Sequence, residues 1–266
     1  MLVSTNLKKR IYVFSNILGY LAMLVVNGLA NAIPLNHKTT GELADALPNL
    51  FVPAGITFAI WGLIYLLLAM LLIYQLYSLL RQEIATGLFV VRIGWWFCIS
   101  CILNMSWIFA WHYEVIWLSL LIMVMLLCTL IIIYRRLDIG GCCAKRNEKV
   151  FVFIPFSIYL GWISVATVAN ATAFLVSLDW NRWGFSEAFW VVAVLALLSG
   201  LTIGVVFRRK DIAYAIPVLW ALTGIIIKRS ADLGGQERIT GLASAAGIAL
   251  IVIAVLVQIL RKKVYN

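Results

Sequence analysis

The stretch Pro53-Ala54-Gly55-Ile56-Thr57-Phe58-Ala59-Ile60-Trp61-Gly62-Leu63-Ile64-Tyr65 decides how the rest of the chain is interpreted. As the start of a helix that enters a membrane, it places Phe58, Trp61 and Tyr65 at positions 0, 3 and 7, within an arc of ~60°. Pro53 suits a first helical turn, because its missing N–H would have no intrahelical partner there. One face of this helix is therefore predicted to be aromatic.

Two later segments repeat this spacing with aromatic and amide side chains. They fall at positions 0, 3 and 7 in one segment and at 0, 3, 7 and 11 in the other: Asn104, Trp107 and Trp111, then Tyr159, Trp162, Ala166 and Asn170. Each of three helices thus carries one aromatic and polar stripe. The simplest arrangement that satisfies all three stripes is one in which they point at each other.

The depth of these residues also favours a shared cleft. At 1.5 Å per residue from the outer ends of the spans, Trp61, Asn104 and Asn170 lie ~10–13 Å deep, and Tyr65 and Trp162 lie ~20–24 Å deep. An aromatic wall with a few hydrogen-bonding groups suits a flat, mostly apolar ligand. The alternative, in which the polar side chains only form hydrogen bonds between helices, stays open.

The composition predicts an all-α, polytopic integral membrane protein. Of the 266 residues, 64% are hydrophobic and 12% are charged, which leaves too little polar surface to cover a soluble protein. Apolar runs of spanning or nearly spanning length cover residues 11–33, 51–77, 89–111, 115–134, 150–178, 188–207, 212–227 and 239–260. We expect a helix bundle of about eight transmembrane helices, or seven if the short seventh run does not span.

The positive charge is explained by its placement. Of the 21 Lys and Arg residues, 16 fall in segments that are cytoplasmic if the N-terminus is cytoplasmic and eight helices span. We therefore expect both termini in the cytoplasm, the bacterial plasma membrane as the location, and membrane lipid rather than nucleic acid as the partner of the net charge of +10.

Catalytic and metal-binding patterns are poor. No span has a charged residue near its middle, which argues against ion-coupled transporters, proton pumps and channels. Cys98 and Cys101 are interpreted as core packing, and His37 and His112 lie in predicted outer loops. We expect no catalytic residue, no metal and no required cofactor.

The three stretches resemble motifs of the TspO/translocator-protein family, the tryptophan-rich sensory proteins. Residues 51–65 are similar to the second-helix motif, residues 103–109 to the third-helix motif and residues 155–170 to the fifth-helix motif. The likeness covers about residues 10–178. The chain departs from the pattern where Ala54 replaces a second proline, and where one residue is missing between Phe58 and Trp61.

The resemblance implies a five-helix membrane core at 1–178, followed by a C-terminal three-helix membrane extension at 179–266. It also implies a pocket open toward the first loop that binds porphyrins, haem or, in animal members, sterols. The ligand-binding residues expected from the stripes and the resemblance together are Pro53, Phe58, Trp61, Tyr65, Asn104, Trp107, Tyr159, Trp162, Ala166 and Asn170.

The function expected from this sequence is that of a membrane receptor or sensor for a porphyrin, haem or a similar planar hydrophobic ligand, acting in regulation or transport. Three alternatives stay open: a secondary transporter or permease of a small amphiphile, an enzyme that degrades porphyrin in light, and a structural or assembly subunit. The small-residue faces at Gly200, Gly204 and 241–247 pack either within the chain or in a homodimer.

Overall fold

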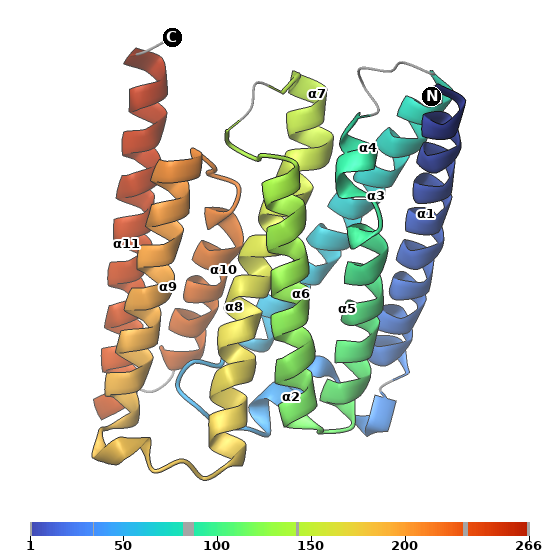
Figure 1. Ribbon diagram of the computed structural model, residues 1–266. Coiled ribbons are helices and arrows are strands. Elements are labelled where there is room, and N and C mark those ends of the chain that lie inside the picture. The colour runs from blue at the N-terminus through green and yellow to red at the C-terminus, as the bar shows by residue number, and fades with distance from the viewer. Residues whose placement is uncertain (1, 34, 82–87, 142–143, 231–233, 265–266) are drawn as a thin grey trace. The chain divides into compact units, whose positions relative to one another are not determined.

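The computed structural model describes residues 2–33, 35–81, 88–141, 144–230 and 234–264 (Figure 1). Every regular element in these ranges is helical, so the all-α prediction is confirmed. The α-helices are α1 (Leu2–Ala32), α2 (Thr40–Asp45), α3 (Ile60–Leu80), α4 (Leu88–Ile93), α5 (Trp96–His112), α6 (Ile116–Arg136), α7 (Arg146–Glu148), α8 (Ile154–Ser177), α9 (Glu187–Arg209), α10 (Ala215–Arg229) and α11 (Gly235–Val264). Three short segments have the tighter turns of a 3₁₀-helix: η1 (Leu35–His37), η2 (Gly55–Ala59) and η5 (Arg182–Gly184). The segment η4 (Lys149–Phe153) has the wider turns of a π-helix.

Each predicted apolar run overlaps at least one helix. Among the described residues, six helical stretches are long and apolar enough to cross a membrane: Leu7–Ala30, Gly55–Leu80, Ile116–Arg136, Arg146–Ser177, Glu187–Arg209 and Gly235–Arg261. A chain with several such helices is a polytopic membrane protein. The prediction of this class is therefore confirmed.

The third and seventh runs form shorter helices than the sequence suggested. In the third run, α4 ends at Ile93 and α5 begins at Trp96, because Gly94 between them has a φ of +55°, which is incompatible with a right-handed helix. In the seventh run, α10 has 15 residues. A helix of that length spans about 22 Å, less than the ~30 Å of a hydrocarbon core. The number eight is therefore approximate.

The chain divides into two compact units. Unit 1 comprises Met1–Thr40 and Trp61–Leu160, and unit 2 comprises Gly41–Ile60 and Gly161–Asn266. The change from one unit to the other falls inside α8, between Leu160 and Gly161. The domain boundary expected at residue 178 stays a prediction.

In unit 1, α1 packs on α5 and α5 packs on α6 (Figure 1). Polar side chains in this packing are paired across helices. The amide of Asn16 in α1 donates to Gln75 Oε1 in α3 at 3.1 Å, and both residues are fully buried. The Tyr20 hydroxyl donates to the Tyr65 carbonyl at 2.7 Å. Such pairs supply the partners that polar groups lack in hydrocarbon.

In unit 2, α9 and α10 both pack on α11 (Figure 1). Helix α10 also packs on η2. Hydrogen bonds join α10 to the segment quoted first. The backbone N–H of Ala54 donates to the Gly224 carbonyl at 3.0 Å, and the Trp220 indole N–H donates to the Thr57 carbonyl at 2.8 Å. The motif segment is thus held by a helix that begins more than 150 residues later in the sequence.

Arg229 holds the chain immediately before the motif. Its side chain is only 11% exposed, and its guanidinium donates to the carbonyls of Asn49, Leu50 and Val52 at 2.7, 3.2 and 3.3 Å. The same guanidinium pairs with Glu237 in α11 at 3.0 Å. An arginine with several N–H donors in a fixed fork can satisfy adjacent carbonyls of one irregular segment together.

The approach of α10 to η2 depends on a glycine. A Cβ added at Gly224 would collide with the Thr57 hydroxyl and would lie 3.0 Å from Thr57 Cβ. We expect Gly224→Ala to lower the free energy of unfolding by about 1–3 kcal/mol, because the added methyl overpacks a buried contact. Thermal unfolding of the purified protein measures this change.

Gly200→Ala in α9 is the matched control, since a Cβ at Gly200 would meet nothing within 4 Å. It should be neutral or slightly stabilising, by up to ~1 kcal/mol, because alanine favours the helix. Equal effects of the two substitutions would contradict the close contact between α10 and η2.

Candidate functional site

The motif segment begins its helix later than the sequence suggested. Pro53 is buried and lies before the helical region, which starts with the tight turns of η2 at Gly55 and becomes α3 at Ile60. Phe58 therefore lies in η2, whereas Trp61 and Tyr65 lie in α3. Because tight turns have about 3 residues per turn, Phe58 is not in helical register with the other two rings. The single-helix interpretation of this stretch was wrong at its first turns.

Aromatic rings of unit 1 form a continuous stack. Trp61 stacks on Tyr65 with ring centroids 5.7 Å apart and on Trp107 at 6.1 Å, and Trp107 stacks on Trp111 at 6.0 Å. Tyr159 contacts Trp61 edge to face at 6.1 Å. Offset stacked and edge-to-face pairs are the favoured geometries of aromatic rings. The structure thus brings together the aromatic residues predicted from three separate stretches.

Side-chain amides lie beside this stack. The Asn27 amide donates to Asn104 Oδ1 at 2.7 Å and to the Met23 carbonyl at 2.9 Å, and the Asn104 amide donates to the Tyr159 hydroxyl at 3.4 Å. Asn104 and Tyr159 are almost completely buried. The Asn27–Asn104–Tyr159 chain links α1, α5 and α8 and orients the amide that the sequence singled out.

The rings of the stack differ in the fraction of their surface that is exposed. Trp107, Trp111 and Tyr159 are buried, with exposed fractions of 4%, 5% and 1%, whereas Trp61 and Tyr65 are partly exposed. The buried rings act as a fixed backing for the two that are partly exposed. Trp61 and Tyr65 are thus the members of the stack that keep some exposed surface.

The predicted site residues of unit 2 form a second group. Phe58 contacts Trp162 edge to face at 6.3 Å. Ala166 and Asn170 lie one and two turns further along α8, and both are buried. The Asn170 amide donates to the Ala166 carbonyl at 2.9 Å, a bond within its own helix. The convergence of this group and the stack of unit 1 on one cleft stays a prediction.

The histidine that the sequence placed in an outer loop is instead buried. His112 is the last residue of α5 and is 0% exposed. Its Nδ1 lies 3.1 Å from the Leu35 carbonyl and its Nε2 lies 3.2 Å from the Thr40 hydroxyl. Both ring nitrogens are thus engaged in holding residues 35–40. No three His, Cys, Asp or Glu residues among those described lie together in a way that could hold a metal ion.

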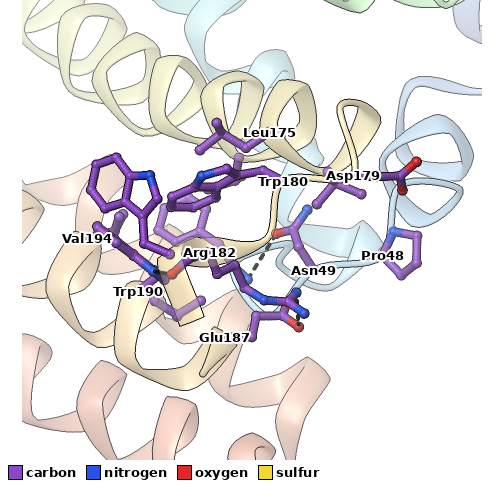
Figure 2. Close-up of a pocket in the computed structure, with 14 residues that line it drawn as sticks. Pro48, Asn49, Leu175, Asp179, Trp180, Arg182, Glu187, Trp190 and Val194 are labelled. Carbon is purple, nitrogen blue, oxygen red and sulfur yellow. Dashed lines mark hydrogen bonds and ion pairs between the residues drawn. The ribbon is translucent and has the colours of Figure 1, made fainter. Parts of the chain in front are cut away.

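Sequence reasoning missed a cavity in unit 2. It has a volume of about 610 Å³ and lies where α8 ends and α9 begins (Figure 2). Three segments supply its lining: Pro48, Asn49 and Phe51; Thr172, Leu175, Val176, Asp179, Trp180, Arg182 and Trp183; and Glu187, Trp190, Val191 and Val194. The sequence signal for it is the cluster of tryptophans and charged residues at 179–190.

The tryptophans of this cavity contact one another. The ring centroids of Trp180 and Trp190 lie 5.0 Å apart, those of Trp183 and Trp190 lie 5.3 Å apart, and those of Trp180 and Trp183 lie 5.4 Å apart. The Trp190 indole N–H donates to the Arg182 carbonyl at 2.9 Å. This bond fixes the Trp190 ring. Because the N–H is used, a ligand in the cavity can contact only the apolar faces and edges of that ring.

A model of the TSPO-like protein family matches residues 12–259. Comparison with curated proteins and with solved structures finds no match. The matched region contains all three motifs and also runs through α9 and α10 and most of α11. The helices after residue 178 thus fall within the family match, although the sequence had suggested a likeness only up to that point. The chain therefore belongs to the TSPO-like protein family.

Proposed function

We propose that this membrane protein is a sensor or transporter that binds a porphyrin, haem or a similar planar hydrophobic molecule. Membership of the TSPO-like family supports a membrane sensor or transporter in general. The observation that carries the ligand proposal is the stack of unit 1, in which buried rings and amides back two partly exposed aromatic faces. A flat, apolar ligand gains most from such a surface, because it can add another ring to the stack.

In this proposal Trp61 and Tyr65 provide the stacking surface. Asn104 supplies a polar group whose position is fixed by Asn27 and Tyr159. From unit 2, we assign Trp162 and Phe58 to the same ligand, because they belong to the same family motifs. Pro53, Trp107, Ala166 and Asn170 complete the proposed set. No required cofactor, catalytic residue or metal forms part of it.

We also propose that both termini are cytoplasmic, in the plasma membrane of a bacterium. The bias of Lys and Arg toward one set of connecting segments supports this orientation. The turn at 178–186, with Asn181, then lies outside the cell, and the segment that contains Asn147 lies inside.

Replacing Trp61 or Trp162 with Leu tests the ligand site. We expect protoporphyrin to bind about 5-fold more weakly to each variant, because loss of an aromatic stacking partner costs roughly 1 kcal/mol. Quenching of tryptophan fluorescence during titration with protoporphyrin measures the affinity, and thermal unfolding verifies that each variant is folded.

Trp117→Leu is the control, since Trp117 is 60% exposed and belongs to no predicted stripe. It should bind like the parent protein. Trp183→Leu, in the cavity of unit 2, should also bind protoporphyrin normally. Weaker binding by Trp183→Leu together with unchanged binding by the Trp61 and Trp162 variants would overturn the proposed site.

Cysteine labelling tests the orientation. In a variant without its five natural cysteines, Asn181→Cys should react with a membrane-impermeant maleimide in intact cells, whereas Asn147→Cys should react only after lysis. Both side chains are exposed. A difference in labelling between intact and lysed cells therefore reports the side of the membrane on which each residue lies. The reverse pattern would contradict cytoplasmic termini.

A further inference from the structure

The cavity at the turn between α8 and α9 has the features of a ligand site that is separate from the porphyrin site proposed above. Its volume of about 610 Å³ lies within the range of ~300–1,000 Å³ that is typical of small-molecule sites. Its walls are mostly apolar, with Phe51 and Val191 almost completely buried. The polar groups gather where the chain turns, which is the pattern expected for an amphiphilic ligand.

The cavity lies at the end of two membrane-spanning stretches. The residues between Arg146–Ser177 and Glu187–Arg209 form its turn, so its polar side is expected at the membrane interface. Tryptophans are enriched at that level. An occupant would therefore place its apolar part along the ends of α8 and α9 and its polar head at the turn.

Figure 2 shows Trp180 and Trp190 on one side of the cavity and Asp179, Asn49 and Pro48 on the other. Trp183 is 71% exposed, so part of its ring is open to a ligand. The Trp190 N–H is already used by the Arg182 carbonyl. Indole rings with open faces attract cations through the negative potential above the ring.

The charges around the cavity leave one carboxylate without a partner. Arg182 lies 3.8 Å from Glu187, and Glu187 also accepts the Leu50 N–H at 2.7 Å. The Asp179 carboxylate, by contrast, has no hydrogen bond or ion pair with any described residue. Since the single lining arginine already faces a glutamate, the excess charge of the lining is negative.

A neighbouring polar cavity of about 320 Å³ does not change this balance. It shares Pro48, Asn49 and Glu187 with the first cavity. Its other charged side chains are paired with each other: Lys228 with Asp45 and Arg229 with Glu237. The charge facing an occupant of the larger cavity is therefore set chiefly by Asp179.

We infer that this cavity binds an amphiphile with a cationic nitrogen head, such as a quaternary ammonium group on an apolar chain. The head lies between the tryptophan rings on one side and Asp179 on the other, and the chain lies against Phe51 and the valines. Two sources supply this chemistry: a membrane lipid with a choline headgroup, or a free amphiphilic amine.

The inference is tested with three amphiphiles that have the same apolar chain length and differ in the charge of the head group. Octyltrimethylammonium, octanol and octanoate are titrated against the full-length protein in lipid nanodiscs, with tryptophan fluorescence and calorimetry as readouts. We expect saturable binding of the cation, about 5-fold tighter than that of octanoate, because cation–π contact and one exposed carboxylate each favour it. Equal or tighter binding of octanoate would show that Arg182 is the anchor, and would overturn the inference.

Two variants and two controls locate the site. Asp179→Asn and Trp183→Leu change exposed side chains, and each should weaken binding of the cation about 2- to 5-fold. Glu148→Gln and Trp117→Leu remove a carboxylate and an indole outside the cavity, and should leave binding unchanged. If all four variants bind like the parent, the cation only partitions into the lipid and the inference is wrong.

The lipid composition distinguishes the two sources. In phosphatidylcholine nanodiscs a choline headgroup competes for the site, whereas in phosphatidylglycerol nanodiscs it is absent. If the affinity difference between the parent and Asp179→Asn is smaller in phosphatidylcholine, the natural occupant is a lipid headgroup. An equal difference in both lipids indicates a free amphiphilic amine. These outcomes do not depend on Trp61 or Trp162, so failure of the porphyrin proposal leaves them unaffected.

Discussion

The irregular backbone before α3 needs hydrogen-bond partners from elsewhere in the chain. An unpaired N–H or carbonyl costs several kcal/mol where water is excluded. In this protein α10 supplies the partners: the Gly224 carbonyl, the Trp220 indole and the Arg229 guanidinium all bond residues between Asn49 and Thr57. The conformation of the family motif therefore depends on a helix that follows the motif-bearing part of the chain.

The C-terminal helices belong to the same family match as the motifs. A segment held by α10 cannot keep its conformation if α10 is absent. Close contact between Gly224 and Thr57 leaves no room for a side chain at that point. Helix α10 thus has a structural role toward the motif, and the start of α9 helps to line the cavity.

The stack of unit 1 illustrates a second constraint. Five rings and two amides contact one another, so that Trp107, Tyr159 and Asn104 are interior groups with fixed positions. Rigid backing of this kind favours binding at the remaining partly exposed rings, since little conformational entropy is lost there. The cavity of unit 2 differs in chemistry, because the charged side chains of Asp179, Arg182 and Glu187 contribute to its lining.

The sequence by itself determined the class of the protein and the side chains of the stack. Apolar runs of sufficient length become helices in a membrane, because only a helix satisfies its own backbone there. Asn104 and Trp107, which the spacing assigned to inward-facing stripes, are buried in unit 1, whereas Trp61 is partly exposed. Both properties follow from local periodicity, which a sequence records directly.

Tertiary structure decided what depends on distant contacts. The late start of the motif helix after Pro53 reflects the bonds from α10, and the burial of His112 reflects its contacts with Leu35 and Thr40. The cavity was missed because its lining comes from residues 48–51, 172–183 and 187–194, which are separated by up to about 120 residues of chain. No periodicity within one segment can show which segments meet, because their meeting is set by the packing of whole helices.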